Sequence, residues 1–224
     1  MKRALITGGT SGIGKALSTL LKEKKIEVTA IGSKDADLSI SREKVIALIH
    51  EKKPDLIVNS AGFGLYGDAV NISIKDQMKM IEVNINAVLE ITLEAANLLL
   101  KEGRSGTILN VASLASRFPT PGMATYGATK AFVTSFSEAC DYELRKKGVR
   151  VLCSCPGMVQ TNFATRAAGK EVVIRGEMSA EYVASRIWRQ IKRGRIRDIF
   201  PSYPRFFPSF LLNPVIYRSI QKRL

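Results

Sequence analysis

Histidine and cysteine, which often serve as metal ligands, catalytic bases or nucleophiles, are scarce in this sequence of 224 residues. The single histidine, His50, lies in a Lys-rich stretch, and no Ser-His-Asp hydrolase can be assembled around it. The three cysteines cannot all pair with one another. Cys153 and Cys155 share one face of a strand-like run, but no further Cys or His lies nearby to complete a zinc site. We therefore expect buried, reduced thiols and no bound metal.

Long apolar runs are also absent. No segment approaches the ~20 consecutive apolar residues of a membrane-spanning helix. The N-terminus enters a short apolar strand and then glycines, without the apolar core and cleavage site of a signal peptide. We therefore expect a cytoplasmic protein. The length and the 46% share of hydrophobic residues predict one globular domain over residues 1–200, followed by a tail over 201–224 that is part of this domain or an interface.

Acidic residues are few in the last third of the chain. Residues 143–224 carry 17 basic and 5 acidic residues, which accounts for most of the net charge of +14. Such an excess suits nucleic acid, an anionic membrane surface, or a field that attracts anionic ligands. Because the basic residues are dispersed and no recognition motif accompanies them, we expect no nucleic-acid binding.

Buried strands and helices alternate along the chain. Strands are predicted at residues 3–7, 27–31, 55–59, 106–111, 149–155 and 198–200. The alternation predicts an α/β fold, a single-domain Rossmann-like doubly wound parallel sheet with a C-terminal helical tail. Too few residues separate the second strand from Asp37 to hold a crossover helix, so we expect a shortened crossover and a reduced sheet edge there. Within the helical stretch 73–101, Asn84 and Asn86 predict a polar site or a local distortion.

The glycine-rich stretch 8–14 lies between the first strand and a helix. This is the context that a dinucleotide-binding loop requires, because glycines let the backbone approach a pyrophosphate and the helix N-terminus favours an anion. No Gly-Lys-Ser/Thr follows, which excludes a P-loop. The cofactor contacts expected here are Gly8, Thr10, Ser11, Gly12, Ile13 and Gly14.

Two later strand ends extend this cofactor prediction. The second strand is followed by Ser33 and Lys34, and a lysine there can accept the 2′-phosphate of NADP. We favour NADP, whereas Asp35 keeps NAD as the alternative. The third strand ends in small residues that suit close ligand approach, among them Asn59, Ala61 and Gly62.

An apolar strand ends near Ser113, and the next helix carries Tyr126 and Lys130. Residues i and i+4 lie on one helix face, ~5–6 Å apart at Cβ. A nearby ammonium lowers the pKa of a tyrosine and moves it toward the range of efficient acid–base catalysis. Ser113 is placed to hold a substrate oxygen by a hydrogen bond.

These motifs occur together and in one order, and with them the sequence resembles the short-chain dehydrogenase/reductase family over roughly residues 3–162. The motifs are the glycine loop, Asn59-Ser60-Ala61-Gly62, Asn84, Ser113, Tyr126-x-x-x-Lys130 and Pro156-Gly157-Met158-Val159-Gln160-Thr161. The sequence departs from the family at Ser60, where the family more often has asparagine.

The resemblance implies hydride transfer between a nicotinamide cofactor and a small carbonyl or alcohol substrate, with Tyr126 as general acid/base. Lys130 would lower the pKa of Tyr126 and bind the nicotinamide ribose, and Ser113 would orient the carbonyl. Asn84, with Asn86 as its rival, would hold a water of the proton relay. Asp37 and Leu38 would flank the adenine, and the nicotinamide amide would be held by Pro156, Gly157 and Thr161. A homodimer or homotetramer and a substrate lid over residues 162–178 are also implied.

The C-terminal stretch from Pro201 is apolar, aromatic and basic. One interpretation is that it packs on the body or on a second subunit. The other is a peripheral membrane contact, or a wall for a lipid-like substrate, because aromatic and leucine residues beside Arg and Lys suit a membrane interface. The alternative to an oxidoreductase is a dinucleotide-binding regulatory or membrane-associated protein without turnover.

Overall fold

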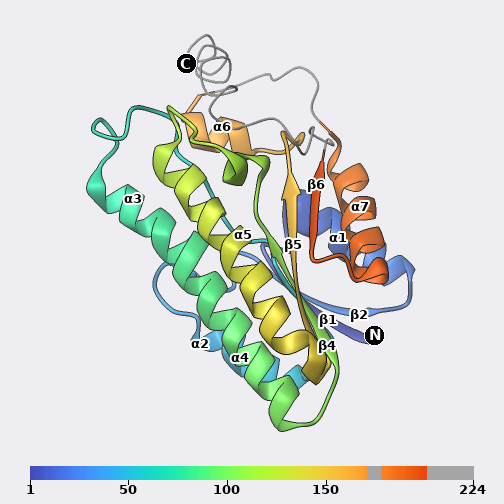
Figure 1. The fold of residues 1–224 in the computed structure, drawn as a ribbon. Coiled ribbons are helices and arrows are strands. Elements are labelled where there is room, and N and C mark those ends of the chain that lie inside the picture. Colours follow the sequence, from blue (N-terminus) through green and yellow to red (C-terminus); the bar gives the residue numbers. More distant parts are fainter. Residues whose placement is uncertain (171–177, 201–224) are drawn as a thin grey trace.

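The computed structural model describes residues 1–170 and 178–200, which form one six-stranded parallel sheet flanked by helices (Figure 1). The strand order is β2-β1-β3-β4-β5-β6. The strands are β1 (Arg3–Thr7), β2 (Glu27–Ile31), β3 (Leu56–Asn59), β4 (Gly106–Val111), β5 (Val149–Pro156) and β6 (Arg197–Phe200). This confirms the predicted doubly wound α/β fold.

Helices cover both faces of the sheet (Figure 1). On one side lie α1 (Gly12–Glu23) and α7 (Ala180–Arg193), and on the other lie α2 (Glu43–Lys52), α4 (Ala87–Lys101) and α5 (Ala124–Leu144). Successive strand residues point to opposite faces, so Ile6 packs with Leu17 of α1 whereas Leu5 packs with Ile91 of α4. Strands buried on both sides explain the continuous apolar runs in the sequence.

The order of the strands reverses direction at β1. The chain leaves β1 for β2 on one side and then crosses to β3 on the other. Because all strands are parallel, their carboxyl ends meet at one edge of the sheet. A crevice outside that edge, at the point where the order reverses, is where ligands bind in open α/β sheets.

The shortened connection after β2 is confirmed. It contains the single helix α2, and among the described residues no strand lies beyond β2, which is therefore the edge strand. The predicted tail falls on residues 201–224, outside the described part of the chain, so the division at residue 200 stays a prediction. The lid is described only in part, as the short helix α6 (Phe163–Ala168).

The predicted distortion in the helical stretch 73–101 is also confirmed. A π-helical turn, η1 (Glu82–Asn86), separates α3 (Ile74–Ile81) from α4 and places Asn84 in the interior. The run Ile74–Lys101 is long and apolar enough, by length and composition alone, to span a membrane. The apolar face of α4 packs into the core against the sheet, which accounts for that composition.

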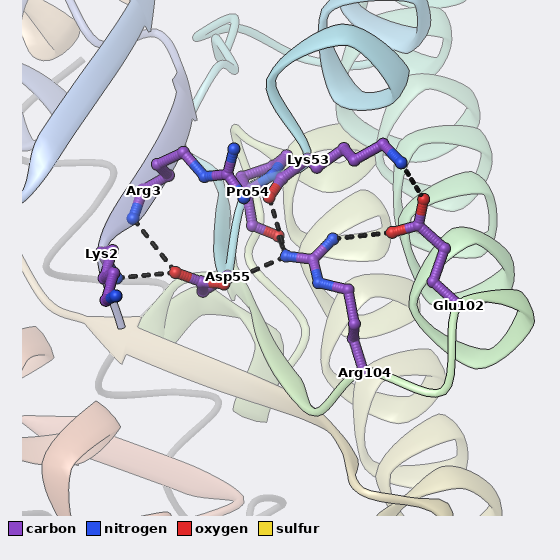
Figure 2. Close-up of polar contacts among 7 residues, drawn as sticks. All are labelled: Lys2, Arg3, Lys53, Pro54, Asp55, Glu102 and Arg104. Carbon is purple, nitrogen blue, oxygen red and sulfur yellow. Dashed lines mark hydrogen bonds and ion pairs between the residues drawn. The ribbon is translucent and has the colours of Figure 1, made fainter.

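A charged cluster closes the opposite edge of the sheet, where the strands begin (Figure 2). Asp55 Oδ2 accepts hydrogen bonds from the backbone N–H groups of Lys2, at 2.6 Å, and Arg3, at 3.1 Å. Arg104 donates to Asp55 Oδ1 at 3.0 Å and also pairs with Glu102. Burial acts to raise the pKa of Asp55, but these donors outweigh it and the pKa is lowered.

Asp55 should therefore contribute to stability through its ionised form. Asp55→Ala should lower the free energy of unfolding at pH 7 by about 1–3 kcal/mol, because two backbone donors and Arg104 lose their acceptor. Since the folded-state pKa is lowered, this contribution should shrink as the pH falls below ~4. Urea unfolding measures both, with Asp68→Ala at an exposed aspartate as the control. An equal loss at acidic and neutral pH would refute the ionic contribution.

Candidate active site

A cleft of about 1310 Å³ opens at the carboxyl edge of the sheet. The cleft is lined by the glycine loop after β1, the segment after β3, the end of β4, the first turn of α5 and the segment after β5. The predicted cofactor contacts that line it are Gly8, Thr10, Ser11, Gly12, Ile13, Ser33, Asp37, Leu38, Ala61, Gly62, Tyr126, Lys130, Pro156, Gly157 and Thr161. Segments far apart in the sequence are thus brought to one place.

The glycine loop forms a tight turn between β1 and α1. Gly8 has a φ of +66°, and a Cβ there would lie 2.8 Å from the backbone N of Ala61. Ser11, the N-cap of α1, makes no side-chain capping hydrogen bond. The helix N-terminus therefore carries backbone donors and a dipole that favour an anion.

The end of β2 differs in part from the prediction. Ser33 lines the cleft, but the exposed Lys34 is not among the lining residues. Asp35 Oδ2 accepts a hydrogen bond of 2.8 Å from Gly32 N, which ties this carboxylate to its own turn. Asp37 faces the cleft, and hydrogen bonds from the hydroxyl and N–H of Ser39 lower its pKa.

Two further predicted contacts also stay away from the cleft surface. Asn59 is buried, and its Nδ2 donates to Thr92 Oγ1 at 3.2 Å and to Asn110 Oδ1 at 2.8 Å. Its amide therefore links β3 to α4 and β4 instead of facing a ligand. Gly14 lies inside α1, where a Cβ would meet the carbonyl oxygen of Gly8, so its part is to keep the turn tight.

Ser113, Tyr126 and Lys130 do converge on the cleft, as the sequence predicted. The Ser113 hydroxyl is close enough to Tyr126 to act on its pKa, and its Oγ accepts a hydrogen bond from Ala115 N at 3.2 Å. Lys130 Nζ donates to the carbonyl oxygen of Val111 at 3.0 Å and lies 5.8 Å from the centre of the Tyr126 ring. A Cβ on Gly62 would lie 3.3 Å from Lys130 Nζ, so the ammonium faces the segment after β3.

The pKa expected for Tyr126 is not found. Burial raises the pKa of Tyr126 to about 12, although the Ser113 hydroxyl acts to lower it. Burial also lowers the pKa of Lys130 to about 8. The prediction that Lys130 lowers the pKa of Tyr126 is therefore wrong. The loss of hydration on burial has the larger effect on this pKa, and the Lys130 ammonium donates to Val111 O instead of to the phenol.

Asn84 does not line the cleft, because its side chain is fully buried behind the segment after β3. Its Oδ1 accepts from Phe63 N at 3.2 Å, and its Nδ2 donates to Phe63 O at 2.9 Å and Thr129 Oγ1 at 3.1 Å. The π turn thus fixes the segment after β3 to the helix that carries Tyr126. Asn86, its rival, instead donates to Glu82 Oε1 at 2.9 Å within its own turn.

Sequence reasoning missed the apolar side chains around Tyr126. Phe63, Tyr66, Met123 and Phe163 line the cleft and pack with Tyr126 in one cluster. Phe63, Tyr66 and Met123 lie between regular elements and Phe163 begins the short helix α6, so neither helical nor strand periodicity could identify them. The only available signal was their position shortly before or after a recognised motif.

A dinucleotide fits the residues that are present. The turn at Gly8 leaves no space for a side chain, the start of α1 offers backbone donors, and the cleft continues to Tyr126 and Lys130. The segment after β1 would hold the pyrophosphate, and Lys130 would hold the nicotinamide ribose. Asp37, which is expected beside the adenine, forms an ion pair with Lys79 at 3.7 Å.

Comparisons with known proteins agree with the doubly wound α/β fold described above. A family model for short chain dehydrogenases matches residues 41–171. Serine 3-dehydrogenase of Agrobacterium fabrum is 31% identical over 188 residues, which is 74% of this chain and 75% of that protein. A short-chain dehydrogenase from Sphingobium yanoikuyae in complex with NADPH has a TM-score of 0.78 at 22% identity, covering 100% of this chain and 96% of that one. A 3-ketoacyl-(acyl-carrier-protein) reductase from Brucella melitensis complexed with NADH has a TM-score of 0.77 at 24% identity, covering 88% and 93%.

The buried ammonium of Lys130 should give stability a distinct pH dependence. Its pKa is about 8 when folded and 10.5 as the ordinary value, so the folded state loses this proton first. The wild type should therefore gain stability over Lys130→Met between about pH 8 and pH 10, on the order of 2 kcal/mol. Urea unfolding across this range measures it, with Lys75→Met on the exposed side of α3 as the control. A difference that is constant with pH would contradict the lowered pKa.

Proposed function

The chain belongs to the short-chain dehydrogenase family, and on that basis we propose that it is an NAD(P)-dependent oxidoreductase acting on a carbonyl or alcohol group. The observation that supports this best is the convergence of Ser113, Tyr126 and Lys130 in the cleft that the glycine loop also lines. The bound nicotinamide would supply or accept the hydride at the reacting carbon.

The protein's own residues would handle the substrate oxygen and its proton. Ser113 would donate a hydrogen bond to the carbonyl oxygen and orient it beside Tyr126. As negative charge develops on that oxygen, the Tyr126 hydroxyl would give up its proton, and an alcohol forms. A phenol with a pKa of about 12 keeps its proton at neutral pH, which suits it to the reducing direction. The Lys130 ammonium would stabilise the phenolate left behind.

Asn84 would act mainly by holding this geometry. Its side-chain amide is already engaged by Phe63 and Thr129, so a relay water would have to use the backbone of the π turn. π turns inserted in α-helices occur often at functional sites. Reprotonation of Tyr126 would then pass along the side of Lys130 that faces Gly62.

The preferred cofactor would be NADP. Ser33 lines the cleft and would contact the 2′-phosphate, and the exposed side chain of Lys34 would turn toward it, whereas Asp35 is bonded to Gly32 N. Asp37 would accept from the adenine amino group, with Leu38 against the ring. The two solved structures compared above hold NADPH and NADH, so they do not decide between the two.

A cytoplasmic homodimer or homotetramer is the assembly that we propose, because members of this family often pair through their long helices. Contact with a membrane through residues 201–224, or a lipid-like substrate beside them, rests on the composition of a segment outside the described residues. Light scattering would refute the assembly by showing a monomer. Unchanged liposome binding after deletion from Pro201 would refute the membrane contact.

The cofactor preference is tested by titrating the protein with NADPH and NADH at one moderate salt concentration. NADPH should bind at least ~10-fold more tightly, a difference of about 1.4 kcal/mol. Lys34→Glu should weaken NADPH binding and leave NADH binding nearly unchanged, whereas Lys75→Glu should affect neither. Equal or tighter binding of NADH would make Asp35 the ribose contact and overturn the preference.

The role of Tyr126 is tested by Tyr126→Phe, which removes only the hydroxyl. Turnover should fall at least ~100-fold because the proton donor is lost. The dissociation constant of NADPH should change by less than ~3-fold, since the ring and its packing remain. Tyr142→Phe, at an exposed tyrosine of the same helix, is the control. If turnover persists in Tyr126→Phe, the assigned chemistry is wrong. If the wild type binds NADPH without turning over any carbonyl or alcohol, the alternative without catalysis is favoured.

A further inference from the structure

The part of the cleft beyond Tyr126 is walled by apolar side chains. Met80, Met123 and Tyr126 form a buried cluster against which Phe63, Leu65, Tyr66, Ala115 and Phe163 pack. Six of these residues also line the cleft, namely Phe63, Tyr66, Ala115, Met123, Tyr126 and Phe163. Phe118, outside the cluster, lines it as well. A substrate whose carbonyl reaches Ser113 and Tyr126 must place the rest of its body against this wall.

Among these side chains, Phe163 packs its ring against that of Tyr126. Its ring centre lies 5.3 Å from that of Tyr126, at an interplanar angle of 52°. A Cβ built on Gly64 would lie 2.8 Å from Phe163 Cζ, 3.0 Å from Met123 Cε and 3.2 Å from Tyr126 Cδ2. The start of α5, which carries Met123 and Tyr126, and the start of α6, which carries Phe163, therefore meet at Gly64.

Backbone hydrogen bonds hold the wall in place. Tyr66 N donates to Ala167 O at 3.0 Å, which fastens the segment after β3 to α6. Gly67 N donates to Gly122 O at 2.9 Å, which fastens the same segment to the loop before α5. Because the segments that carry Tyr66, Met123 and Phe163 are joined in this way, their side chains form a fixed surface.

The side chains that pack around Tyr126 are apolar apart from the Tyr66 hydroxyl. The Thr120 hydroxyl donates toward Phe118 O at 3.1 Å and Ala115 O at 3.4 Å. Ser113 and Tyr126 are needed at the carbonyl oxygen, and the other polar side chains that line the cleft near this wall are Tyr66, Asp68, Arg166 and Lys170. Hydroxyl groups of a polyhydroxylated substrate that lie against the apolar cluster would lose hydration there, and this penalty selects against such a substrate.

On the basis of the proposed function, we propose that the substrate is a carbonyl or alcohol compound with an apolar group about the size of a ring next to the reacting carbon. We further propose that Phe163 selects this group. Each methylene transferred from water to such a wall favours binding by about fourfold. When the wall is contacted in the transition state, that preference appears in kcat/KM.

The first experiment compares three ketones with the full-length protein and saturating NADPH. Cyclohexyl methyl ketone and acetone share an aliphatic methyl ketone and differ in apolar bulk, and dihydroxyacetone adds hydroxyl groups to acetone. Cyclohexyl methyl ketone should have a kcat/KM at least ~30-fold above that of acetone. Dihydroxyacetone should do no better than acetone. A preference for acetone or dihydroxyacetone would overturn the inference and leave the oxidoreductase proposal standing.

The second experiment assigns the preference to one residue. Phe163→Ala should lower kcat/KM for cyclohexyl methyl ketone about 10-fold, mainly through KM, and for acetone less than ~3-fold. Phe163→Leu should restore part of the loss. The matched control is Phe136→Ala, because Phe136 is a half-buried residue of α5 that stacks on Phe132 at 5.6 Å and does not line the cleft. Equal losses for both ketones would show that Phe163 only positions Tyr126, and would refute its role in selection.

A binding measurement separates failure of this inference from failure of the proposed function. Saturation-transfer NMR with NADPH present reports whether each ketone binds, whatever its turnover. If no ketone is reduced but cyclohexyl methyl ketone binds and Phe163→Ala abolishes that binding, the apolar wall stands and the oxidoreductase assignment falls. If cyclohexyl methyl ketone neither binds nor reacts, the apolar substrate class is refuted.

Discussion

The buried ammonium of Lys130 is the constraint on which the cleft depends. A charged group in the interior is costly unless it is paired, and Lys130 has one backbone acceptor, the carbonyl oxygen of Val111 at the end of β4. That contact fixes the first turns of α5 against the sheet and so fixes Tyr126. The lowered pKa of Lys130 shows that the pairing is incomplete. Titratable groups whose pKa is shifted by burial are found often at functional sites.

A second set of contacts makes this arrangement rigid. The asparagine of the π turn joins the backbone at Phe63 to Thr129 of α5, and Thr129 donates in turn to Tyr126 O at 2.7 Å. The same segment after β3 carries Gly62 at its start and Tyr66 at its end, so one short connection touches both the lysine and α6. One short stretch of chain thus connects the cofactor end of the cleft to its substrate end.

The sequence predicted what depends on local pattern and on the order of motifs. Strand and helix alternation gave the doubly wound sheet, and two asparagines among apolar residues gave the distorted turn at Asn84. It could not show where a side chain turns once its strand is packed, so Asn59 was placed in the cleft although its amide bonds Asn110. The pKa of Tyr126 was assigned the wrong direction because spacing shows a nearby cation but not the loss of water. The wall beside Tyr126 comes from loop residues and from the short helix that Phe163 begins, and these segments are too short to show a periodicity.

The cluster centred on Asp55 lies where the strands begin (Figure 2), and the cleft lies where they end. Parallel strands separate them by the full length of the core, so the two edges share no side chain. Selection can therefore act on each edge almost independently over evolutionary time. In a lineage that moves to a warmer or more acidic habitat, the ion pairs at the start of the strands can change while the residues that contact the substrate stay the same.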